Sequence, residues 1–236
     1  MKKLIASWMA LALALVVVPV FAGDDKADDL KKLTEATTTI KEILSIPENG
    51  IPQEMLDNAA AVVVIPDMVK AAFIVGGKGG DGVMSLHGGT GWSNPAFVEA
   101  GGGSVGLQAG IEEADLVLVF MSEKHVNKLL NGEFTLGADA SVAAGPVGRQ
   151  GSIGTNENAK SAIYAYSRSQ GVFAGVSLDG TKFDVDEEAN VRVYGTGANV
   201  HNIVHGKQAT KAPAEAETFK TTLNSLTKAE NVKAKM

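Results

Sequence analysis

The feature that most constrains the fold is a run with a two-residue period between Ile163 and Gly180. From Ala165 to Ser177 the odd positions are all small except Phe173. The even positions read Tyr164, Tyr166, Arg168, Gln170, Val172, Ala174, Val176 and Leu178. Because successive side chains of a strand point to opposite faces, the run predicts a strand that another element can approach closely on its small face. The pair Asp179-Gly180 predicts a turn into a hairpin or a strand-to-helix corner.

Further extended segments are predicted on both sides of this run. Residues 61–65 and 71–75 are apolar and bracket Pro66, so we expect buried strands there, while the glycine-rich residues 76–82 predict a flexible turn before the strand at 83–86. Alternation at 103–111, the apolar run 116–121 and the small residues of 136–144 predict three more strands. The fold class that follows is α+β, with a curved, mostly antiparallel, glycine-rich sheet or a partly open barrel.

Amphipathic helices are expected to flank this sheet. The spacing of Leu30, Leu33 and Ile40 predicts a helix over residues 27–44. The other predicted helices are a short one from Pro52 to Leu56, one capped by Ser122 and ending at Leu130, one over 187–194 that stops at Gly195, and one over 214–226.

The first 22 residues have the composition of a secretory signal peptide. Lys2 and Lys3 precede an apolar run from Leu4 to Val20, and cleavage is expected after Ala22. An uncleaved membrane anchor is the alternative, because the apolar run is close to the shortest length that spans a bilayer. Removing residues 1–22 leaves 19 basic and 27 acidic side chains, a net charge of −8. This charge argues against a nucleic-acid partner, and a chain with no cysteine has no disulfide and no thiolate metal site.

Motifs that suggest catalysis occur in contexts that do not support it. Ser104 lies in a Gly-x-Ser-x-Gly sequence, but the alternation that follows predicts a strand where a hydrolase has a helix. Residues 77–82 match a dinucleotide fingerprint with no helix after it, and a glycine-rich turn is the preferred interpretation. His201 and His205 lack the glutamate of a zinc protease and are interpreted as surface histidines. The acidic run 184–188 is interpreted as a helix cap, and neither a cofactor nor a metal is predicted.

The run around residues 167–180, Ser-Arg-Ser-Gln-Gly-Val-Phe-Ala-Gly-Val-Ser-Leu-Asp-Gly, resembles the signature strand of the SYLF family of lipid-binding domains. Matching segments follow the family's order at 61–66, 70–83, 92–97 and 186–195, so the resemblance covers about residues 30–227. It implies phosphoinositide and membrane binding, and for some eukaryotic members actin binding, without catalytic residues. The implied organisation is a signal peptide (1–22), an N-terminal amphipathic helix (23–50), a SYLF-like domain (51–227) and a flexible tail (228–236).

Five basic residues are the candidates for contact with lipid: Lys31, Lys32, Lys41, Lys78 and Arg168. The first helix could place its apolar face in a headgroup layer, or that face could cover the sheet, and its mixed charges provide no polybasic stripe. Lys78 could contact a headgroup phosphate beside backbone amides. Arg168 could bind a phosphate or form an ion pair within the sheet.

The functional expectation is an exported, non-enzymatic domain that binds a phospholipid membrane surface at the cell envelope. The alternative is a structural or protein-interaction module of the periplasm with an envelope protein as its partner. The sequence leaves the oligomeric state and the lipid open.

Overall fold

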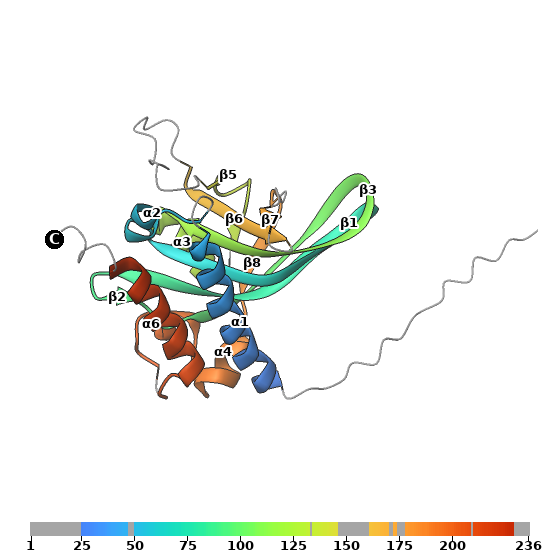
Figure 1. The fold of residues 1–236 in the computed structure, drawn as a ribbon. Coiled ribbons are helices and arrows are strands. Elements are labelled where there is room, and N and C mark those ends of the chain that lie inside the picture. The colour runs from blue at the N-terminus through green and yellow to red at the C-terminus, as the bar shows by residue number, and fades with distance from the viewer. Residues whose placement is uncertain are drawn as a thin grey trace, which may run out of the picture.

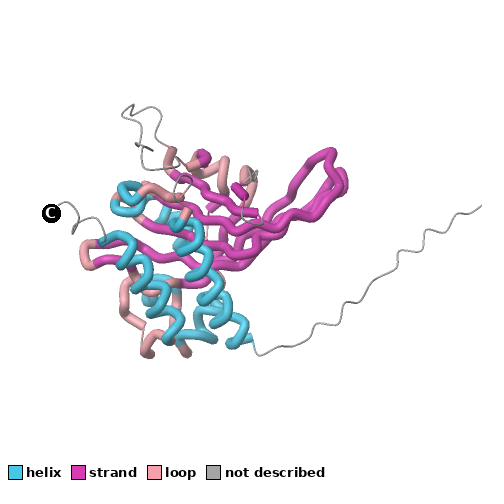
Figure 2. Tube along the Cα trace, in the orientation of Figure 1, coloured by secondary structure: helices cyan, strands magenta, loops and turns pink. Residues whose placement is uncertain are grey.

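The computed structural model describes residues 25–46, 50–132, 134–145, 161–169, 172–173, 178–208 and 210–228. The helices are α1 (Asp25–Ser45), α2 (Gln53–Asp57), α3 (Glu123–Leu130), α4 (Glu187–Tyr194), α5 (Val200–Val204) and α6 (Ala214–Lys228). The strands are β1 (Ala61–Gly88), β2 (Gly91–Trp92), β3 (Ala96–Phe120), β4 (Phe134–Thr135), β5 (Val142–Ala144), β6 (Ile163–Ser169), β7 (Val172–Phe173) and β8 (Lys182–Val185). The predicted α+β class is confirmed (Figures 1 and 2).

One long hairpin forms the centre of the sheet. Strands β1 and β3 pair antiparallel from Ala61 opposite Phe120 to Met84 opposite Ala96. The register shifts between Ile65 and Met68, where Asp67 has a φ of 53°, and again between Ala72 and Ile74. Such irregularities bend a strand, and the hairpin curves so strongly that its two halves lie across one another (Figure 1).

The glycine-rich residues 76–82 are part of strand β1, so the prediction of a flexible turn there was wrong. Their glycines allow two parts of β1 to approach each other closely. A Cβ on Gly82 would lie 2.1 Å from the backbone oxygen of Val64, and one on Gly80 would lie 2.9 Å from the side chain of Ile65. The second half of β1 therefore packs directly on its first half.

The remaining strands extend this hairpin into an open, strongly curled half-barrel. Strand β6 pairs antiparallel with the end of β3, from Asp115 opposite Arg168 to Phe120 opposite Ile163. Strand β8 pairs with the beginning of β3, β4 pairs with β8, and β5 adds to β6 in parallel. The sheet is mostly antiparallel, as expected from the sequence.

Two predicted strands are broken in the structure. Strands β6 and β7 pair antiparallel with each other, so the chain reverses direction between Ser169 and Val172, where the two-residue period had predicted one continuous strand. Residues 174–177 of that prediction lie outside the described residues. The segment 136–144 contains a turn at Gly137, whose φ of 84° ends an extended run, before β5 begins at Val142.

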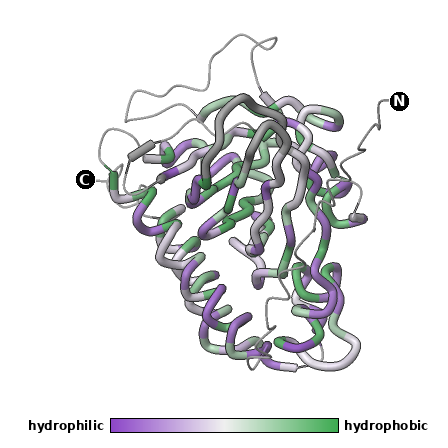
Figure 3. Tube along the Cα trace, turned by 90° about the vertical axis from the view of Figure 1, so that its right-hand side faces the viewer, coloured by the Kyte–Doolittle hydropathy of each residue, from purple (hydrophilic) through white to green (hydrophobic). Residues whose placement is uncertain are grey.

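The helices lie against one side of the sheet, and Figure 3 shows hydrophilic and hydrophobic residues alternating along them. Helix α1 packs on β1, α6 and α4. Its side chains Leu33, Ile40 and Ile43 are completely buried, each contributing about 1.5–3 kcal/mol through the hydrophobic effect. The apolar face of the first helix therefore covers the core. Of the two roles considered for this face, the structure supports packing on the sheet and not insertion into a membrane.

The helix ends follow the predicted signals. The carboxylate of Asp186 accepts a 2.9 Å hydrogen bond from the backbone N–H of Ala189 and caps α4, which stops at Gly195 with a φ of 92°. Ser122 occupies the position before α3, although its side chain makes no capping bond.

Candidate functional site

The most distinctive surface feature is the part of the long hairpin that leaves the body of the molecule. Figures 1 and 2 show β1 and β3 projecting together, away from β2 and the helices. We define the projecting end as residues 71–77 of β1 and 103–111 of β3, which are joined by pairing from Ala71 opposite Ile111 to Gly77 opposite Gly103.

The projecting end contains no charged residue. Its two segments read Ala-Ala-Phe-Ile-Val-Gly-Gly and Gly-Ser-Val-Gly-Leu-Gln-Ala-Gly-Ile. The side chain of Ile111 is 79% exposed, and Val69, next to the projecting end, is 40% exposed. Because directly opposed residues share a face, Val69, Ala71 and Ile111 lie on the same side of the ribbon. This surface can be removed from water only by contact with another apolar phase or another molecule.

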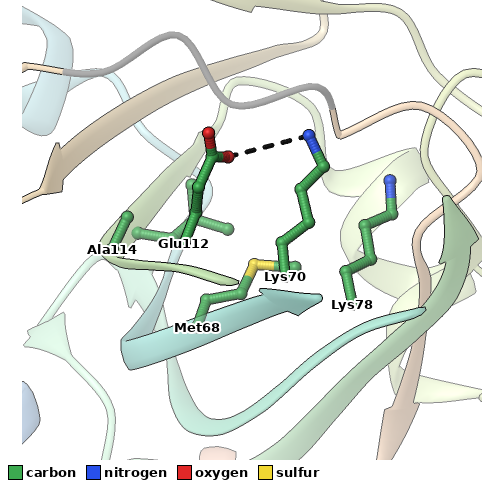
Figure 4. Close-up of a pocket in the computed structure, with 6 residues that line it drawn as sticks. Met68, Lys70, Lys78, Glu112 and Ala114 are labelled. Atoms are coloured by element: carbon green, nitrogen blue, oxygen red, sulfur yellow. Dashed lines mark ion pairs between the residues drawn. The ribbon is translucent and has the colours of Figure 1, made fainter. Parts of the chain in front are cut away.

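Charged residues begin at the base of the projecting end. The Nζ of Lys70 lies 3.7 Å from a carboxylate oxygen of Glu112, directly across the hairpin. With Lys78 and the apolar side chains of Met68, Ala114 and Leu116 they line a small hollow on the opposite face from Ile111 (Figure 4).

Lys78 is one of the few buried polar residues of the described chain. It is 7% exposed, and its Nζ donates a 2.8 Å hydrogen bond to the backbone oxygen of Asp179. Burial lowers the pKa of Lys78, while the nearby Asp179 opposes that effect. The ammonium group therefore holds the hairpin against the turn that precedes β8.

The five predicted lipid contacts do not form one cluster. Lys31 and Lys32 pair with Glu35 at 2.8 and 3.4 Å, and Lys41 is exposed further along α1. Arg168 donates to Asp115 at 2.8 Å and to Glu42, so it forms the ion pair that was one of its two predicted roles. Hydrogen bonding to Asp115 raises the pKa of Arg168. A lipid contact by any of the five remains a prediction.

The backbone context excludes the motif-based catalytic sites. Ser104 lies inside β3, and residues 77–82 lie inside β1, so neither motif has the helix that its chemistry requires. His201 and His205 are exposed at the two ends of α5. Within the described ranges, no group of three or more metal-binding side chains comes together.

Sequence reasoning missed the exposed residues Val69 and Ile111, as well as Lys70 and Glu112. A sequence signal for this site existed. Lys70 directly precedes the uncharged segment 71–77, Glu112 directly follows the uncharged segment 103–111, and the two residues lie opposite each other in the sheet. Interpreting residues 76–82 as a turn concealed that register.

Comparison with known proteins identifies the domain. Residues 101–226 match the family model described as "Ysc84: Las17-binding protein actin regulator". Protein YSC84 of Saccharomyces cerevisiae is 36% identical over 172 residues, which is 71% of this chain and 36% of that protein. The human SH3 domain-containing YSC84-like protein 1 is 32% identical over 202 residues, 84% of this chain and 56% of that protein.

The chain spans about a third to just over a half of these relatives, whose names describe SH3-containing, Las17-binding or YSC84-like proteins. From Asp25 to Lys228, no described helix is both long and apolar enough to cross a bilayer. The matched region includes the second half of the projecting end and the strands that support it. The chain belongs to the Ysc84 (SYLF) family.

Proposed function

We propose that this chain is an exported, non-enzymatic domain that binds phospholipid membranes through its projecting end. The observation that carries the proposal is the 79% exposure of Ile111 on a ribbon that has no charged residue and extends away from the body. Contiguous exposed apolar surface marks sites that contact a protein or a membrane, and Val69, Ala71 and Ile111 lie together on one face of the ribbon.

A hairpin is suited to shallow insertion. The pairing of β1 with β3 holds on both sides of an irregularity between Ala72 and Ile74, which lies opposite residues 107–109, so the paired residues have the backbone groups of one strand edge hydrogen-bonded. The other edges can remain among headgroups and water, because an interfacial segment enters only about 5–10 Å. Full burial of a side chain such as Ile111 contributes about 1.5–3 kcal/mol, so a few such residues give reversible binding.

Electrostatic attraction has a minor role in this binding mode. Lys70 at the base is within reach of a lipid phosphate, but Glu112 faces it and Glu113 follows. Helix α1 is unavailable, since Leu33 and Ile40 are buried in the core. Binding is therefore expected to persist in high salt.

Co-sedimentation of the mature chain, which starts at Gly23, with phosphatidylcholine vesicles tests the proposal. Replacing Ile111→Asp places a charge in the apolar layer, and we expect the bound fraction to fall by about tenfold, since that step costs more than roughly 1.4 kcal/mol. The matched control is Val191→Asp, because Val191 is 39% exposed on α4, which lies away from the projecting end (Figure 1). Equal binding by the two variants, or no binding by the parent chain, would refute insertion through this end.

Export is a separate part of the proposal and rests on residues 1–22, which lie outside the described residues. Expression of the full chain in a bacterium, followed by fractionation and mass determination, is expected to give a product that starts at Gly23. A product that keeps Met1 in the cytoplasmic fraction would contradict export without affecting the vesicle result.

A protein partner is the second candidate function, favoured by the family description as a Las17-binding actin regulator. The same projecting end could then pack on a protein surface. Co-sedimentation with actin filaments, without vesicles, tests this candidate. Pelleting with filaments by a chain that does not bind vesicles would favour the protein-interaction module.

A further inference from the structure

A cleft of about 660 Å³ lies at the end of the molecule that carries β2, opposite the projecting end (Figure 1). Segments that are distant in sequence converge on it: the turn between β1 and β2, the beginning of α3, the end of α5, and α6. Its volume is in the range of small-molecule sites.

One wall of the cleft is flat and apolar. The rings of His87 and Trp92 stack with centroids 4.5 Å apart and planes inclined by 13°. The Nδ1 of His87 lies 3.2 Å from the backbone oxygen of Ala59, which fixes the plane of the imidazole. Leu86 and Val126 extend this wall, so it can receive an apolar ligand body.

The lining contains a buried hydrogen-bond donor that lacks an acceptor within the described chain. Trp92 is 2% exposed, and its indole N–H has no acceptor among the described residues. Asn94 is 7% exposed, and its Oδ1 accepts a 3.1 Å bond from Lys220. A buried N–H without an acceptor is destabilising, and an acceptor supplied by a ligand would satisfy the indole of Trp92.

The lining contains a basic side chain with which an anion can pair. The Nζ of Lys220 donates to Asn94 and lies 3.6 Å from a carboxylate oxygen of Glu217 on the same helix, a partly exposed pair of the kind that contributes little. In this lining Glu123 is the one carboxylate among the described residues, and it is exposed at the start of α3. Oxygen acceptors with negative charge therefore complement the inner part of the cleft.

From these features we infer that the cleft binds a small organic carboxylate with an apolar body. The carboxylate accepts hydrogen bonds from Lys220 and from the indole N–H of Trp92, and the apolar body packs on the His87–Trp92 wall. The inference is independent of membrane binding, since the projecting end lies at the other end of the molecule.

Isothermal titration of the full chain with phenylacetate, octanoate and the neutral isostere phenylacetamide tests the inference. We expect a carboxylate to bind at least about tenfold more tightly than the amide, because a neutral amide cannot form a charge-assisted bond with Lys220. Failure of both carboxylates to bind at millimolar concentration, or equal affinity for phenylacetate and phenylacetamide, overturns it.

Three variants locate the site. Lys220→Met is expected to weaken carboxylate binding by about tenfold, and Glu123→Gln to strengthen it by about threefold through loss of repulsion. The Glu123 variant keeps the test informative if Lys220→Met fails to fold. Ile111→Asp serves as the control and is expected to leave the affinity for carboxylates unchanged. A failure of the membrane proposal can therefore be told apart from a failure of the carboxylate inference. An unchanged affinity in both the Lys220 and Glu123 variants contradicts the assigned position.

Discussion

At the scale of single residues, glycine determines how tightly the hairpin can fold on itself. A Cβ on Gly82 would meet the oxygen of Val64 at 2.1 Å and the backbone of Ile65 at 2.9 Å. The obstacles are backbone atoms in the centre of the core, so they cannot rotate away. Gly101, in the neighbouring strand, would meet nothing within 4 Å.

Replacing Gly82→Ala is therefore expected to reduce the free energy of unfolding by at least about 2 kcal/mol, as overpacking does in a dense core. Urea denaturation followed by circular dichroism measures the change. Gly101→Ala is the matched control and is expected to change stability by less than about 0.5 kcal/mol. Similar losses in the two variants would show that general strand propensity, rather than contact with Val64, is responsible.

At the scale of elements, two ion pairs attach helix α1 to the rest of the fold. Near its beginning, Asp29 accepts bonds of 2.7 and 3.1 Å from Arg192 of α4. Near its end, Glu42 accepts from Arg168 of β6, which also bonds Asp115 of β3. Between these attachments the buried side chains of α1 pack on the sheet, so charge pairs fix the position of an apolar interface.

A double-mutant cycle on Glu42→Gln and Arg168→Met tests this attachment. Arg168 is 21% exposed in its side chain, and we expect a coupling free energy of about 1 kcal/mol, in the range of contacting residues. The pair Lys31–Glu35 is the control, because the Lys31 side chain is 73% exposed and such exposed helical pairs contribute little to stability. Chemical denaturation of the single and double variants supplies both values, and coupling no larger than the control would contradict the role of Arg168.

At the scale of the whole molecule, charge is distributed unfavourably for contact with an anionic surface. The chain carries a net charge of −6. Asp81, Glu99 and Asp184 stand side by side on adjacent strands β1, β3 and β8. Burial, followed by the charges of Asp186 and Asp184, raises the pKa of Glu99. Under the proposed function, repulsion of this kind disfavours approach of this acidic surface to an anionic membrane and favours approach through the uncharged projecting end.

Vesicles of different charge are therefore expected to respond differently to salt. Binding to anionic vesicles should be weaker than binding to zwitterionic ones at low salt, and should increase as salt screens the repulsion over about 10 Å at 0.1 M. Binding to phosphatidylcholine should be insensitive to salt. Co-sedimentation across a salt series measures both, and a decrease in anionic binding with added salt would mean that basic residues such as Lys70 or Lys41 dominate.

Local signals predicted the helices well and the strands less well. The acidic cap at Asp186 and the glycine at 195 identified the bounds of α4, because both signals act within one turn of helix. The two-residue period at 163–178 located β6 but not the reversal before β7. Both strands of a hairpin show the same alternation, so the period alone does not reveal where the chain turns back. The glycines at 76–82 suggested a turn, although they lie within a strand that packs on its own first half.

The candidate sites depended still more on tertiary structure. No sequence pattern placed Trp92, Asn94 and Lys220 in one cleft, because they come from β2, the segment after it and α6. Likewise, the exposure of Ile111 follows from the bend of the hairpin, which carries the projecting end away from the helices (Figure 1).

The sequence by itself determined the α+β class, the amphipathic character of the helices and the membership in a family, because these depend on local periodicity and on motifs. Tertiary structure alone decided that the first helix is buried, that Arg168 is ion-paired and that the hairpin folds across itself. These outcomes depend on which apolar surfaces meet and which charges neutralise each other, and such contacts join residues more than a hundred positions apart, as Arg168 and Glu42 do.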